Sequence, residues 1–146
     1  MAITKYNPRT IWLGGEITEV NDIASSGVIK PGMLLERYNA GGVPKFRAHS
    51  AAGSSGACIV ALNQPELNQS YDVPYKDGDL IHAGIGRSGT TFYVLLTASG
   101  TALVPGDGLE SNGDGTLKKS AGATRMFNVV EAYTPSAVPY ARAEVI

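Results

Sequence analysis

The sequence predicts an all-β fold, a single compact β-barrel or β-sandwich domain with an extended N-terminal arm. The 146 residues suit one domain. The 18 glycines and 8 prolines are spread along the chain, which indicates many turns. Short runs rich in Val, Ile, Thr, Tyr and Phe lie between the turns, as is typical of strands. No window combines the apolar spacing of a helix with flanking caps.

We place the arm at residues 1–15 and the barrel or sandwich domain at residues 16–146. The arm is unusually apolar for a chain terminus, where polar residues are normal. Its large apolar side chains are the candidate contacts with a capsid or with further copies: Ile3, Tyr6, Ile11, Trp12 and Leu13. Two interpretations stay open. The segment forms the first strand of the barrel, or it pairs as an extended strand with an exposed sheet edge of a partner.

Within the domain, the turn signals separate about ten short strands. Asn39 to Gly42 predicts a hairpin between the first two, and the sequence SNGDG at residues 111–115 predicts another. A polar loop with two prolines is expected at residues 63–77. The expected strands are residues 33–38, 44–48, 57–62, 80–85, 91–97, 101–104, 109–110, 116–118, 125–133 and 140–146.

Residues 84–89 match the G-x-G-x-x-G pattern of dinucleotide-binding loops. That pattern must open a helix, because the pyrophosphate binds the amides at the helix N-terminus. Here a predicted strand follows, so we interpret the segment as a hairpin turn. We expect no cofactor.

The candidate chemical groups are few. Three Asp/Gly clusters suggest calcium loops, but the fit to an EF-hand lacks its final glutamate, and Asp-Gly pairs also favour turns. The only cysteine is Cys58, in an apolar run, and only His49 and His82 are available as bases or zinc ligands. Ser54 lies outside any G-x-S-x-G elbow. We therefore expect a protein that is not an enzyme, with no metal and no catalytic residues.

Charge and hydropathy argue against two classes of partner. The net charge is −1 and only 17% of the residues are charged, so the basic surface needed for nucleic acid is not expected. No apolar run approaches the ~20 residues of a membrane span. The N-terminal residues do not have the pattern of a signal peptide. We expect a protein that is made and used in solution.

Three segments resemble a known group of proteins. The sequences YDVPYKDGDLI at residues 71–81 and VPGDGLESNGDGTL at residues 104–117 are similar to turn-and-strand motifs of small phage head proteins. The final strand at residues 138–146 is similar as well. Together they resemble the capsid decoration (cement, or head auxiliary) proteins of tailed bacteriophages. The resemblance covers roughly residues 28–146 and does not include the first 27.

This resemblance implies a structural virion protein, made in the host cytoplasm, that decorates and stabilises the outer surface of the mature capsid. Its partners would be the major capsid protein and further copies of itself, with a trimer favoured and a dimer possible. In that group the N-terminal arm often carries capsid contacts.

Two alternatives differ in the partner. One is a tail-tube or fibre-associated virion β-domain, which would share the composition. The other is a carbohydrate-binding β-module that uses Trp12, Tyr38 or Tyr140 as stacking platforms, although aromatic residues more often fill cores.

Overall fold

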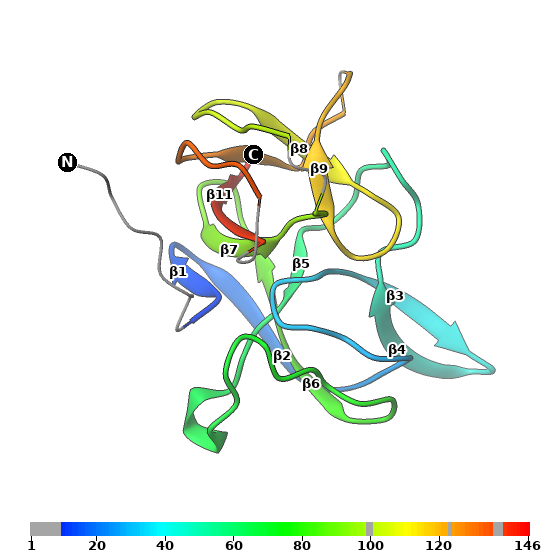
Figure 1. Cartoon of the computed structure of the whole chain (residues 1–146). Coiled ribbons are helices and arrows are strands. Elements are labelled where there is room, and N and C mark those ends of the chain that lie inside the picture. Colours follow the sequence, from blue (N-terminus) through cyan, green and yellow to red (C-terminus); the bar gives the residue numbers. More distant parts are fainter. Residues whose placement is uncertain (1–9, 99–100, 123, 136–138) are drawn as a thin grey trace.

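The computed structural model of the chain describes residues 10–98, 101–122, 124–135 and 139–146 (Figure 1). These residues contain strands, turns and one short 3-10 turn, η1 (Pro65–Leu67). None of their helices is long and apolar enough to span a membrane. The predicted all-β class is confirmed. The strands are β1 (Trp12–Gly14), β2 (Ile17–Ser25), β3 (Leu34–Ala40), β4 (Val43–Ala48), β5 (Ile59–Ala61), β6 (Leu80–Gly86), β7 (Thr91–Leu95), β8 (Gly108–Ser111), β9 (Leu117–Lys119), β10 (Phe127–Val129) and β11 (Tyr140–Val145).

The strands form two sheets, and the predicted barrel is one of them. One is a closed barrel in the order β2-β4-β3-β5-β6, and the other is an open six-stranded sheet in the order β1-β7-β11-β10-β8-β9. One apolar core fills the barrel, and a second lies between the sheet and the barrel strands β3 and β5, which contribute Leu34 and Val60. Phe46 and Ile81 are fully buried in the barrel, while Phe92 and Phe127 are fully buried under the sheet.

The β3–β4 hairpin forms at the predicted position. The side chain of Asn39 closes its turn by accepting a hydrogen bond from the Gly42 amide at 2.7 Å. Only Leu34 and Leu35 of β3 also pair with β5. β4 pairs with β2 through Lys45 and Phe46, so only the tip of the hairpin, residues 39–44, projects as a two-stranded ribbon (Figure 1).

β2 was not predicted from the sequence. Its ladder with β6 contains an irregularity between Val20 and Ile23. A β-bulge of this kind adds a residue and breaks the alternation of inward and outward side chains. Val20 and Ile23, which both pack against the barrel core, are consequently three residues apart rather than two, whereas Ile17 packs against the other core.

The turn at residues 84–89 does not form the predicted hairpin. β6 pairs with β2 and β5 in the barrel, whereas β7 pairs with β1 and β11 in the sheet. The turn between them, closed by a 2.9 Å hydrogen bond from the Thr90 amide to the Arg87 carbonyl, is a corner that leads from one layer to the other. The Thr90 hydroxyl also donates to the Glu16 carbonyl at 2.6 Å, which ties the corner to the start of β2.

Two other predicted strands are shorter than expected. The run at 101–104 is reduced to a single bridge between Leu103 and Tyr133. Of the run at 125–133, only Phe127–Val129 forms a strand, because this stretch pairs with β8 on one side and β11 on the other. The sequence signal for a strand was correct here, but pairing partners exist for only part of each run.

Candidate interaction surface

The first described strand forms one edge of the six-stranded sheet. β1 pairs with β7 through Trp12 opposite Phe92 and Gly14 opposite Thr91. The chain enters this strand at Ile11, whose carbonyl accepts a hydrogen bond from the Tyr93 amide at 2.8 Å. On its other side β1 pairs with no other strand among the described residues. This side is a sheet edge, which presents unpaired backbone groups to a partner.

The structure separates the five predicted contact residues. The side chains of Trp12 and Leu13 are 39% and 37% exposed at the sheet edge. Ile11 is fully buried in the core of the sheet, so the expectation that its side chain contacts a partner is wrong. Ile3 and Tyr6 lie outside the described residues. Of the arm expected over residues 1–15, the described part is anchored in the sheet.

The two edges of the sheet differ in charge. β9, at the far edge, carries Lys118 and Lys119, and Lys119 forms a 3.3 Å ion pair with Asp107. Lysines on an edge strand oppose the addition of further strands. β1 and its neighbours from Thr10 to Gly15 contain no charged residue. The β1 edge is therefore the better suited of the two to accept a strand from a partner.

The aromatic residues suggested for sugar binding do not form a common platform. Tyr140 is fully buried. The ring of Tyr38 is covered by the guanidinium of Arg47, which lies 4.3 Å from its centroid. Only Trp12 has an exposed ring. This arrangement removes two of the three stacking residues on which the carbohydrate alternative depended.

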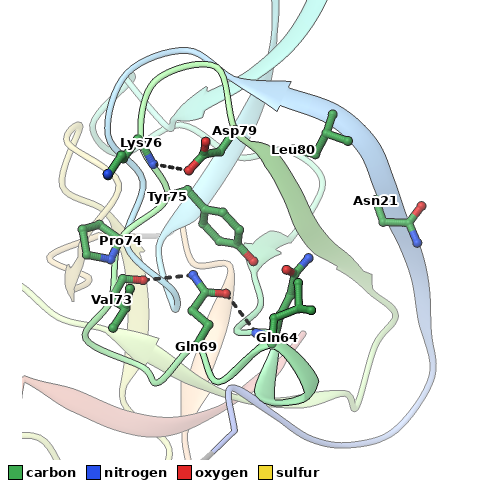
Figure 2. A pocket seen from close by; sticks show the side chains of 10 residues that line it. Asn21, Gln64, Gln69, Val73, Pro74, Tyr75, Lys76, Asp79 and Leu80 are labelled. Carbon is green, nitrogen blue, oxygen red and sulfur yellow. Dashed lines mark hydrogen bonds between the residues drawn. The ribbon is translucent and has the colours of Figure 1, made fainter.

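A groove of about 890 Å³ lies on the outside of the barrel, between the loop that connects β5 to β6 and the strands β2 and β6 (Figure 2). The Gln69 side chain braces the loop by accepting a hydrogen bond from the Gln64 amide at 3.0 Å and donating one to the Val73 carbonyl at 2.9 Å. The groove is lined by Asn21, Gln64, Leu67, Gln69, Val73, Pro74, Tyr75, Lys76, Asp79 and Leu80.

The potential nucleophiles are buried or already hydrogen-bonded within the fold. Cys58 is buried, and burial raises the pKa of its thiol to about 11. The buried His49 holds Nδ1 2.8 Å from the Ser111 hydroxyl oxygen, but Ser111 is itself fully buried and out of reach of a substrate. The hydroxyl of Ser54 donates to the Ala51 carbonyl at 3.0 Å.

The acidic turns also have local partners. In the β8–β9 turn, hydrogen bonds from the Thr116 side chain and backbone lower the pKa of Asp114, against a smaller opposing effect of burial. His82 pairs with Glu19 at 2.8 Å. Across the described parts of the chain, no three His, Cys, Asp or Glu side chains gather as metal ligands would.

Comparisons with known proteins show what this fold resembles. No known family and no curated protein matches the sequence. The fold resembles the base of a phage head fibre. One matching solved structure is the crystal structure of the head fiber gp8.5 N base in bacteriophage phi29, with a TM-score of 0.60 and 14% sequence identity. The similarity covers 90% of this chain and 95% of that chain, so it extends over both layers rather than one of them.

Sequence reasoning missed the groove and the difference between the sheet edges. The apolar groove residues Leu67 and Val73 lie in a loop that was predicted to be polar, and Leu80 begins the predicted strand at residues 80–85. The only available signal was the isolated position of Leu67 and Val73 among polar residues. The edge position of β1 depends on pairing between distant segments, which no local pattern encodes.

Proposed function

We propose that this chain is a structural protein of a phage virion that decorates and stabilises the outer surface of the mature capsid. The observation that carries the proposal is the fold similarity to a phage head fiber base over nearly the whole of both chains. The decoration-protein motifs at residues 71–81 and 104–117 support the same location. The role requires no catalysis, in keeping with the burial of Cys58 and Ser111.

The β1 edge is the proposed contact with the major capsid protein. An extended capsid segment would add to the sheet beside β1, where main-chain hydrogen bonds supply affinity and the side chains of Trp12 and Leu13 supply apolar contact. A protein that binds only the mature shell stabilises that state by mass action. A homo-oligomer, with a trimer favoured, would add avidity by engaging several capsid subunits at once.

A second candidate is a fibre-associated role, in which this domain is the base of a head fibre. The same fold similarity favours it, since the matching chain is described as a head fiber base. Both roles place the domain on the outside of the head. They differ in what the domain carries: a cement protein stabilises the shell by itself, and a fibre base supports a further fibre.

The test is solution mass followed by co-sedimentation with phage shells stripped of their outer proteins. We expect a compact oligomer that pellets with expanded shells and stays in solution with unexpanded precursors. Bound domain that makes expanded shells more resistant to heating supports the cement role, and binding without any gain in shell stability supports the fibre base. Failure to bind either kind of shell would overturn both.

A further inference from the structure

The buried ring of His49 has one nitrogen that is engaged inside the fold. Nδ1 lies 2.8 Å from the hydroxyl oxygen of Ser111, which is fully buried. That oxygen already accepts a hydrogen bond from the Gly113 amide at 3.1 Å. Within the described residues, Nδ1 of His49 is the only acceptor that the Ser111 hydroxyl contacts. A buried hydroxyl without an acceptor is costly, so Ser111 donates and Nδ1 accepts.

This hydrogen bond fixes the tautomer of the neutral His49 ring. Because Nδ1 is the acceptor, the proton of the neutral imidazole is on Nε2. No described residue is a hydrogen-bond partner of Nε2. Among the described residues, the one buried side-chain nitrogen or oxygen without a partner is Nδ1 of His82, so Nε2 of His49 must reach the surface. His49 therefore presents an N–H group to solvent, although the residue is only 6% exposed.

The surface that His49 reaches is a pocket of about 310 Å³. The pocket lies between β3 and the loop that connects β4 to β5. This loop is fastened to β8 by a 3.0 Å hydrogen bond from the Gly53 amide to the Ser111 carbonyl. The walls are therefore in place before a ligand enters, which reduces the free-energy cost of binding.

Three residues of the lining carry donors that no other described residue uses: His49, Arg37 and Ser55. Arg37 forms no ion pair with the described residues. Its guanidinium carbon lies 5.3 Å from the centre of the Phe46 ring, and this contact orients it. The Ser55 hydroxyl is exposed. A ligand of this pocket must therefore supply hydrogen-bond acceptors.

The charge of the pocket favours a ligand with a single negative charge. The lining also contains Glu36, but Nε of Arg47 donates to its carboxylate at 2.8 Å, so these two charges offset each other. Arg37 remains as the uncompensated charge. A guanidinium matches the two oxygens of a carboxylate. Repulsion by Glu36 would be stronger for a doubly charged phosphate than for a carboxylate.

We propose that this pocket binds a carboxylate, which accepts hydrogen bonds from Nε2 of His49 and from the guanidinium of Arg37. Ser111 is a positioning residue, because its hydroxyl keeps the proton on Nε2. Two sources can supply the carboxylate: a small free carboxylate ion, or an Asp or Glu side chain of a partner protein. The site is separate from the β1 edge, and the proposal does not rest on the virion role.

NMR of the imidazole nitrogens tests the tautomer. The chain has only two histidines, and His82 pairs with Glu19, so it serves as a reference in the same spectrum. In mildly alkaline solution, where imidazoles are normally neutral, we expect the proton of His49 on Nε2. A proton on Nδ1 would overturn the proposal, because the ring would then present no donor to the pocket.

Sodium acetate is the probe for binding, titrated against sodium chloride at constant ionic strength. We expect the Nε2 signal of His49 to shift and to saturate in the millimolar range, while the signals of His82 stay in place. The absence of a saturable shift would overturn the proposal. Inorganic phosphate is titrated in the same way, and tighter binding of phosphate than of acetate would overturn the assignment to a carboxylate.

Two variants with the same change in net charge show whether the pocket itself is responsible. Arg37→Gln should weaken acetate binding at least roughly tenfold, because the charged donor is lost. Lys45→Gln removes a cation of the same hairpin that does not line the pocket, and it should leave acetate binding unchanged. Equal losses in the two variants would indicate general electrostatic attraction and would overturn the site.

Co-sedimentation with expanded shells distinguishes the two sources of the carboxylate. Weaker shell binding by Arg37→Gln than by Lys45→Gln, by at least roughly tenfold, would assign the pocket to an acidic side chain of the capsid. Equal shell binding by the two variants would assign it to a free carboxylate ion. The acetate titration decides whether the site exists even where the wild type binds no shell, so failure of the virion role and failure of the site are distinguishable.

Discussion

The phenolic oxygen of Tyr140 lies 2.9 Å from the carbonyl oxygen of Pro31, although 109 positions separate the two residues in the chain. The same hydroxyl lies 3.2 Å from the Tyr71 carbonyl, and the two tyrosine rings meet edge to face. Burial, with a smaller effect of Tyr71 and Asp72, holds the pKa of Tyr140 above its usual range. The hydroxyl therefore stays a donor that joins β11 of the sheet to the loop before β3 of the barrel.

Tyr140→Phe should lower the free energy of unfolding by about 1–2 kcal/mol, because the buried carbonyls lose their donor while the packing of the ring is kept. Urea denaturation measures the change. Tyr38→Phe is the control, since that side chain is only partly buried and its ring lies against the Arg47 guanidinium. Equal effects of the two substitutions would show that the Tyr140 hydroxyl does not join the layers.

Gly32→Ala should destabilise the protein more than Gly78→Ala. Both glycines have φ +89°, so the backbone strain of a side chain is the same at each. A Cβ at Gly32 would lie 2.6 Å from Cε1 of Tyr140, whereas a Cβ at Gly78 has open space. Strain alone amounts to about 1–2 kcal/mol, and the steric overlap adds about 1–3 kcal/mol at Gly32. Thermal melts of the two variants side by side measure the difference.

Stability should fall in acid through Glu36. Partial burial opposes its ionisation, but hydrogen bonds from Ser50 and Arg47 outweigh that effect and lower the pKa of Glu36 below its ordinary value of 4.5. A lowered pKa in the folded state stabilises the protein above pH 4.5, and this contribution is lost as the pH falls through the folded-state value.

Glu36→Gln should therefore remove about 1 kcal/mol at neutral pH and almost nothing at the most acidic pH that the fold tolerates. Urea denaturation at several pH values between these limits measures how the free energies of unfolding of the wild type and Glu36→Gln converge. Glu16→Gln, at a carboxylate whose side chain is 78% exposed, is the control. A constant gap between wild type and Glu36→Gln at every pH would contradict the assignment.

The thiol of Cys58 should resist alkylation in the folded protein. Its pKa is raised to about 11 by burial, so little thiolate exists at pH 8. We expect modification by iodoacetamide only under denaturing conditions, followed by intact mass. Rapid modification of the native protein would show that the Cys58 region opens readily.

Leu13→Lys should weaken shell binding by at least roughly tenfold while changing stability by less than about 0.5 kcal/mol. A lysine at the β1 edge opposes strand addition, and the Leu13 side chain is already 37% exposed. Co-sedimentation with expanded shells gives the affinity. Val104→Lys, at an exposed position away from the edge, should bind normally. Unchanged shell binding by Leu13→Lys would show that the capsid contact does not lie at the β1 edge.

Much of the fold followed from local patterns. The β3–β4 and β8–β9 hairpins were predicted because Asn and Gly specify their turns, and β5 because three successive buried residues form an apolar run. β2 was missed because its bulge hides the alternation. A turn signal indicates that the chain reverses direction, but it does not indicate which sheet each flanking strand joins. The corner at Arg87 was therefore predicted as a hairpin.

The site was less predictable than the fold. Trp12 and Leu13 were chosen for their apolar character, and their side chains are exposed; the same character selected Ile11, which fills the core. Composition does not distinguish an apolar residue that faces a partner from one that faces the interior. That distinction depends on the register of β1 against β7, which is set by distant residues.

The order β1-β7-β11 has a mechanical consequence. β1 and β11 both run antiparallel to β7, so they point in the same direction. Tension applied between the two ends of the chain would pull these strands in opposite senses along their axes. The hydrogen bonds of an antiparallel ladder are perpendicular to the strands, so this load would shear all of them together instead of opening them one at a time. Forces applied to the segments that flank β1 and β11 would therefore be opposed by the whole ladder at once.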